Sequence, residues 1–140
     1  MPVTLCIRPD VGVMFVNFSG HATAAEAVAA CKDYQDHPDF SAGQKHLINF
    51  SDVTSFEGDF TKLMELQAKL LDGLTDDQQV LFVFCAPTPL SQQLAQYSVN
   101  AWKDSDKVIA RLLDSEVAAM DVVGLPNMTF ADLTHQTTQT

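Results

Sequence analysis

Apolar and polar residues alternate over two short segments at the start of the chain, residues 3–8 and 11–18, with Pro9-Asp10 between them. Alternation with a period of two predicts β-strands, and a proline–aspartate pair between two such segments predicts a tight turn. We therefore expect the chain to begin with an antiparallel hairpin that ends at Gly20.

Helical periodicity follows in four later segments. The first begins after Thr23, which stands three residues before Glu26 in the spacing of a capping box, and His37-Pro38 ends it at about residue 36. The same kind of spacing predicts helices from about residue 59 to 74, from 90 to about 103, and after Ser115. Four helices are thus expected.

Short apolar runs separate these helices, at residues 47–50, 80–85 and 107–112. Runs of this length and composition are typical of strands buried on both faces. The expected order is ββαβαβαβα, an α/β fold whose mixed, largely parallel sheet carries its helices mainly on one face, because parallel crossovers are right-handed. We expect a single domain over residues 1–125, followed by a mobile, Thr- and Gln-rich tail over 126–140.

The charge and the cysteines narrow the class of protein. The formal net charge is −10 and the basic residues form no cluster, which argues against nucleic-acid binding. Three widely spaced cysteines, Cys6, Cys31 and Cys85, suit neither a disulfide framework nor a zinc site. The N-terminus lacks the basic region and long apolar run that are typical of a signal peptide, and no apolar run reaches the length of a membrane span, so we expect a reduced, cytoplasmic protein.

Candidate chemistry is sparse. Asp52, Glu57 and Asp59 fall in the polar segment after the central strand, but their spacing matches no calcium loop, and a capping aspartate with two solvated acids is the favoured interpretation. Cys85 ends a strand, yet no basic neighbour would activate its thiol, so packing is favoured. The four histidines are scattered, and no phosphate-binding loop, dinucleotide fingerprint or nucleophile elbow occurs. We therefore expect no metal, no cofactor and no enzymatic activity.

Several phrases along residues 11–124 resemble the STAS superfamily, and more closely its SpoIIAA-like bacterial branch, whose fold is related to Sec14-type lipid-binding domains. They are the helix entry from Gly20 to Glu26 (G-x-x-T-x-x-E), HPDFSAGQKHLINFSDVTSFEGDF, VLFVFCAPTPLSQQLAQY and VIARLLDSEVAAMDVVGL. The resemblance implies an interaction module that binds a protein partner.

One part of the pattern differs. Anti-sigma-factor antagonists of this superfamily carry D-S-S-G after the central strand, and a kinase phosphorylates one of those serines. Glu57, Gly58 and Asp59 stand in the corresponding place here, so no hydroxyl is kept. We therefore expect no phospho-switch in this segment.

Two functions remain open. The first is a regulatory module that binds a protein partner through loops after the parallel strands; the second is a carrier or sensor of a small apolar or lipid-like ligand. A deep apolar cavity would favour the second function, and a shallow polar surface would favour the first.

Trp102 and the apolar helix faces suggest a homodimer. The expected binding loop comprises Ser51, Asp52, Thr54, Ser55, Glu57, Gly58, Asp59 and Thr88.

Overall fold

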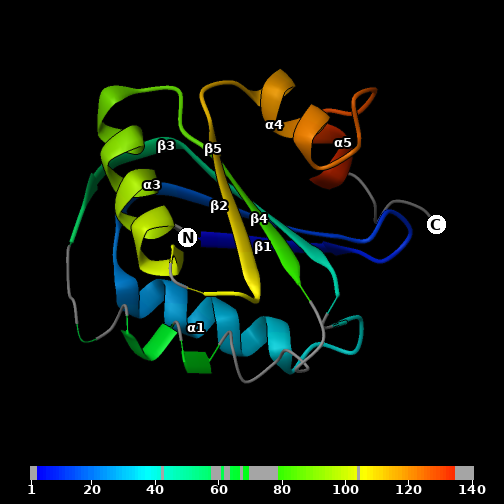
Figure 1. The fold of residues 1–140 in the computed structure, drawn as a ribbon, viewed down its shortest axis with the longest axis horizontal. Helices are drawn as coiled ribbons and strands as arrows, with labels where there is room; N and C mark the ends of the chain where they lie inside the picture. Colours follow the sequence, from blue (N-terminus) through cyan, green and yellow to red (C-terminus); the bar gives the residue numbers. More distant parts are fainter. Residues whose placement is uncertain are drawn as a thin grey trace.

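A five-stranded sheet forms the centre of the molecule (Figure 1). The computed structural model describes residues 3–41, 43–57, 61, 64–66, 68–69, 79–103 and 105–134. The strands lie in chain order, with β1 antiparallel to β2 and every later pair parallel. They are β1 (Val3–Arg8), β2 (Val13–Ala22), β3 (Lys45–Phe56), β4 (Val80–Cys85) and β5 (Val108–Leu113).

The described helices are α1 (Ala24–Gln35), α3 (Pro89–Trp102), α4 (Glu116–Val122) and α5 (Phe130–Thr134), and the described residues within 61–69 are also helical. The α/β class and the largely parallel sheet are thus confirmed. None of the described helices has the length and apolarity needed to cross a bilayer.

Side-chain caps fix where three helices begin. Thr23 and Glu26 form the expected capping box at α1, and Thr88 forms a second one with Ser91 at α3. The hydroxyl of Ser115 accepts a hydrogen bond from the backbone N–H of Ala118 at the start of α4. Each cap satisfies amide groups that the first helical turn leaves without partners.

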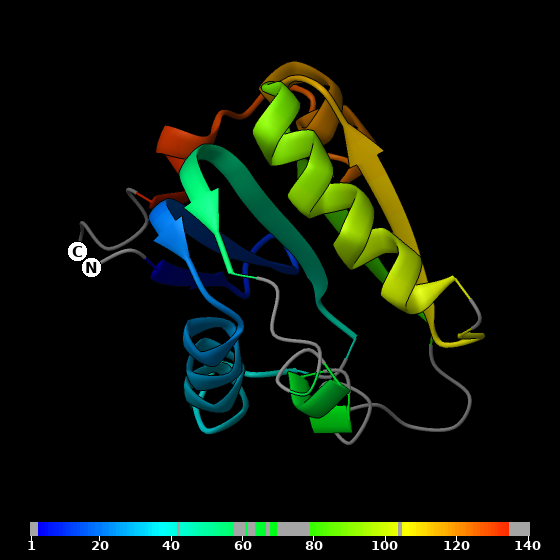
Figure 2. The same ribbon diagram turned by 90° about the vertical axis from the view of Figure 1, so that its left-hand side faces the viewer.

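The two faces of the sheet carry separate apolar clusters. Ile48, Phe82 and Trp102 belong to the cluster under α1 and α3, whereas Leu47, Val83 and Met120 belong to the cluster under α4 and α5. Because each parallel strand lies one position further along the sheet, right-handed crossovers place α1 and α3 on the same face. Figures 1 and 2 show α4 and α5, which follow the last strand, on the opposite side.

Two strands extend further than the sequence predicts. β2 continues through Gly20, whose φ of 67° lies at an irregularity of the β2–β3 pairing, and it ends at Ala22. β3 continues to Phe56, so residues 51–56 belong to a strand and not to a loop. Val53 is buried between exposed neighbours in this extension, and pairing with β2 alone lets the strand carry polar residues.

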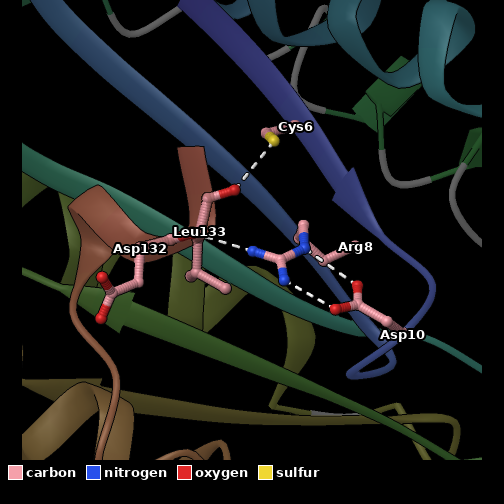
Figure 3. Close-up of polar contacts among 5 residues, drawn as sticks. All are labelled: Cys6, Arg8, Asp10, Asp132 and Leu133. Atoms are coloured by element: carbon pink, nitrogen blue, oxygen red, sulfur yellow. Dashed lines mark hydrogen bonds and ion pairs between the residues drawn. The ribbon is translucent and has the colours of Figure 1, made fainter. Parts of the chain in front are cut away.

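The segment after residue 125, expected to be mobile, contains α5, so the packed chain extends at least to Thr134. Leu133 of α5 is fully buried. Figure 3 shows how β1 holds this helix: the Cys6 thiol donates to the Leu133 carbonyl at 3.1 Å, and Arg8 Nη1 donates to the Asp132 carbonyl at 2.8 Å. Asp10 in the following turn fixes the Arg8 guanidinium through two hydrogen bonds of 2.9 and 2.6 Å.

Candidate functional site: an apolar cavity and a polar groove

A cavity of about 140 Å³ lies between the sheet and the helices α1 and α3. Its lining is mostly apolar and comes from strands on the floor and from helices on the walls. The side chains that define it are Val16, Ile48, Phe50, Phe82 and Phe84 from the sheet, Ala27, Cys31 and Tyr34 from α1, Leu94, Tyr97 and Trp102 from α3, and Leu66.

A cavity of this size is costly in a protein core. Protein interiors pack as densely as organic crystals, and voids larger than a water molecule are few. A closed apolar void of about 140 Å³ would cost roughly 3 kcal/mol at about 24 cal/mol per Å³, and this value is an upper limit here because the cavity is partly open. A ligand that fills the cavity would stabilise the fold by an amount set by its affinity and concentration.

His46 lies in the floor of this cavity. Its side chain is 6% exposed and stacks on Phe82 with ring centroids 4.3 Å apart, while Tyr34 meets it edge-on at 5.3 Å. Burial lowers the pKa of the imidazole from 6.5 to about 3, so the ring is neutral at pH 7. No described residue forms a hydrogen bond with either ring nitrogen. His46 is therefore a buried polar side chain without a partner among the residues that the structure describes.

Two other polar groups of the lining, those of Tyr34 and Ser98, have partners within the chain. The Tyr34 hydroxyl donates to Gln44 Oε1 at 2.6 Å, and the Ser98 hydroxyl donates to the Leu94 carbonyl at 3.0 Å. Burial raises the pKa of the Cys31 thiol to about 11, against the opposing effect of Lys69, so it stays protonated. Unlike these groups, the His46 imidazole is a buried polar group of the lining that forms no hydrogen bond with a described residue.

Glu57 connects the cavity with the end of β3. Its side chain is exposed and also lines the cavity, so the cavity reaches the surface there. The Glu57 backbone N–H donates to the Ala22 carbonyl at 2.9 Å, which holds this residue beside the end of β2. Among the described lining residues Glu57 is the one with a carboxylate, and none is a lysine or arginine.

A second, open groove of about 370 Å³ lies on the opposite face of the sheet, beside α5. Ser51 and Asp52, two of the expected binding residues, line it together with Asn17, Asn49 and Glu116. Asn49 is 6% exposed; its amide donates to Asn17 Oδ1 at 2.6 Å, and its Oδ1 accepts from the Ser51 hydroxyl at 2.6 Å. The groove is thus lined by an ordered, hydrogen-bonded set of polar side chains.

The remaining expected site residues lie elsewhere. Ser55 forms a hydrogen bond of 2.8 Å with His21 Nδ1, Thr54 is exposed on β3, and Thr88 caps α3. Gly58 and Asp59 lie outside the described residues. The described members are therefore divided between the cavity, the groove, two structural contacts and, for Thr54, an exposed position on β3, and they do not form one surface.

Three further residues from the sequence interpretation have clear positions. Trp102 is buried and packs edge-on against Phe82, so the expected homodimer loses this support and stays a prediction. Tyr97, on the same helix, lines the cavity. Cys85 is buried in the cluster beneath α4, and burial is the main reason why its thiol pKa is raised, as suits a packing role.

No protein-family model matches the chain, and no curated protein sequence matches it. The resemblance to STAS proteins therefore stays a prediction from the phrases of the sequence quoted above. Sequence reasoning also missed the two most informative features, the cavity and His46. The signal that was present for His46 is a polar residue opening a run, HLINF, that is otherwise mostly apolar.

Proposed function

We propose that this protein is a non-enzymatic carrier or sensor that binds one small apolar molecule between its sheet and the helices α1 and α3. The observation that carries the proposal is the mostly apolar cavity of about 140 Å³ in that position. An engineered apolar cavity of about 150 Å³ binds benzene, so this volume suits a molecule with a single ring or a chain of similar size.

The residues that line the cavity suit the binding of an apolar molecule better than they suit catalysis. Aromatic and aliphatic side chains surround the cavity, and a ligand within it would gain dispersion contacts and lose little hydration. Ligand binding would also recover part of the stability lost to the empty volume, by an amount that rises with ligand concentration. The protein would therefore be most stable when loaded.

We expect Ala27→Leu to weaken binding of p-xylene at least about tenfold. Ala27 lines the cavity from α1, and the added carbon atoms of leucine would occupy the space that the ligand needs. Ala29→Leu is the matched control, because Ala29 is exposed on the same helix. Each protein is titrated with p-xylene, and the NMR chemical shifts of the protein methyl groups are monitored to obtain the dissociation constant.

Two outcomes would contradict the proposal. Wild-type protein that does not bind p-xylene at any concentration up to its solubility would show that the cavity does not accept apolar ligands. Equal binding by wild type and Ala27→Leu would place the ligand elsewhere. Mass spectrometry of an organic extract of the protein purified from its native cells then identifies the natural ligand.

A second candidate function, recognition of a protein partner, is favoured by the polar groove on the opposite face. Asp52 and Glu116 give this groove an acidic character that suits a basic or hydrogen-bonding segment, and the resemblance to STAS proteins favours the same role. We expect Asp52→Lys to release a partner that wild-type protein and Ala27→Leu both retain during purification from native cells. Asp33→Lys, an exposed charge reversal on α1, is the control. A partner retained equally by all four proteins would exclude the groove.

A further inference from the structure

The polar atoms of His46 are the unexplained feature of the cavity. The ring is held in place by Phe82 on one side and Tyr34 on another, and its side chain is 6% exposed. A buried polar group without a hydrogen bond costs about 1–3 kcal/mol, and proteins rarely leave such a group unpaired. No described residue supplies the partner, and a molecule within the cavity that His46 lines would lie within reach of the ring.

We infer that the ligand is a small neutral alcohol or phenol whose hydroxyl group forms a hydrogen bond with His46 while its hydrocarbon part fills the apolar cavity. This inference rests on the proposed function and adds the chemistry that selects the ligand. A hydroxyl group matches His46 because a neutral imidazole presents one N–H donor and one nitrogen acceptor, and a hydroxyl can pair with either.

Charged ligands fit the same position less well. A carboxylate would have to leave water without a described lysine or arginine in the lining to pair with it, and Glu57 at the surface end would repel it. An ammonium group would also lose its hydration, and the burial that lowers the pKa of His46 disfavours any positive charge at this depth. Neutral ligands avoid both costs.

Size and shape complete the argument. The floor is aromatic around His46, with Phe82 stacked on it and Trp102 edge-on to Phe82 at 5.3 Å, so a flat ring can pack closely there. A single ring with one hydroxyl group is close to the size that a cavity of about 140 Å³ accepts. 4-Methylphenol is therefore a suitable probe, and p-xylene is nearly identical in shape but lacks the hydroxyl.

The test compares these two probes in wild-type protein, His46→Phe and His46→Gln by calorimetric titration. Phenylalanine removes both ring nitrogens and keeps the ring, whereas glutamine keeps one donor and one acceptor. We expect His46→Phe to shift the ratio of the two dissociation constants by about tenfold in favour of p-xylene, as loss of one hydrogen bond implies. His46→Gln should keep most of the preference for 4-methylphenol. The ratio cancels any change in cavity volume, because both probes occupy the same space.

The imidazole itself provides a second readout. In wild-type protein, 4-methylphenol should shift the ¹⁵N resonances of His46, and p-xylene should leave them nearly unchanged. A ratio of dissociation constants that is the same in wild type and His46→Phe would overturn the inference and leave the proposed function intact. It would mean that the ring pairs with something other than the ligand. Failure of both probes to bind wild-type protein would overturn the proposed function as well.

Discussion

Replacing His46 by phenylalanine should make the empty protein more stable, by about 1–3 kcal/mol at pH 7. The imidazole is buried between Phe82 and Tyr34 without a described hydrogen-bond partner, so its removal ends a desolvation cost and loses no described contact except ring packing. Phenylalanine can keep that packing and extend slightly into the cavity. Denaturant unfolding of ligand-free wild-type protein and His46→Phe measures the difference.

The stability difference should also grow as the pH falls. Burial lowers the pKa of His46 from 6.5 to about 3, so between these values the unfolded chain binds a proton that the folded chain does not. The free energy of unfolding of wild-type protein therefore decreases as the pH is lowered through this window, by up to about 1.4 kcal/mol per pH unit from this group. His46→Phe lacks this contribution, so its advantage should increase by about 2 kcal/mol between pH 7 and pH 5.

His46→Gln separates the cost of burying a polar group from the effect of titration. Glutamine is polar but does not titrate, so the His46→Gln protein should be less stable than His46→Phe by an amount that does not depend on pH. A difference between wild type and His46→Phe that does not change with pH would show that the imidazole is accessible to protons in the folded state. A less stable His46→Phe at pH 7 would show that the ring nitrogens already have a partner.

A gain in stability from the loss of a polar side chain is expected at a binding site. Sites for ligands commonly hold groups that the empty protein leaves poorly satisfied, and stability recovers when the ligand binds. The proposal predicts the same relation here: a hydroxyl-bearing ring would fill the cavity and pair with the imidazole, for which no described residue supplies a hydrogen bond.

Local signals in the sequence were sufficient for most of the fold. The capping pair Thr23 and Glu26 predicts the start of α1, and the apolar run at 80–85 predicts β4 with the bounds that the structure has. These features depend on residues a few positions apart, so a single sequence contains them. The sequence interpretation did not include the order of the strands in the sheet; the observed order agrees with the tendency of consecutive strands to lie side by side.

The site could not be predicted in the same way. The cavity forms where side chains from α1, α3, four strands and Leu66 do not fill the space between them, and no spacing in the sequence indicates that such a space will form. The polar residues 51–55 suggested a loop because their composition is that of a loop. They belong to a strand because β2 continues through Gly20 and pairs with them, which is a long-range contact.

The helix α5 was missed although its signal was present. Thr129 and Asp132 stand three residues apart, and they form hydrogen bonds of 2.9 and 3.2 Å that match a capping box. The helix has only five residues, too few to show a helical period, so the Thr- and Gln-rich composition around it dominated the interpretation. Its packing comes from distant parts of the chain, above all from Cys6 and Arg8 of β1.

Leu133→Ala should therefore lower the free energy of unfolding by about 2–5 kcal/mol, the range for a leucine truncated in a closed core. Leu133 is 0% exposed and packs in the cluster under α4 and α5. The hydrogen bonds from β1 to the carbonyls of residues 132 and 133 limit how far the helix can move to fill the space that truncation leaves.

Val117→Ala, on α4, is the control, because Val117 is 80% exposed and its truncation should change stability by less than about 0.5 kcal/mol. Denaturant unfolding of the three proteins gives both values. A loss below about 1 kcal/mol for Leu133→Ala would show that α5 detaches before the sheet unfolds, and that the cooperative unit ends before this helix.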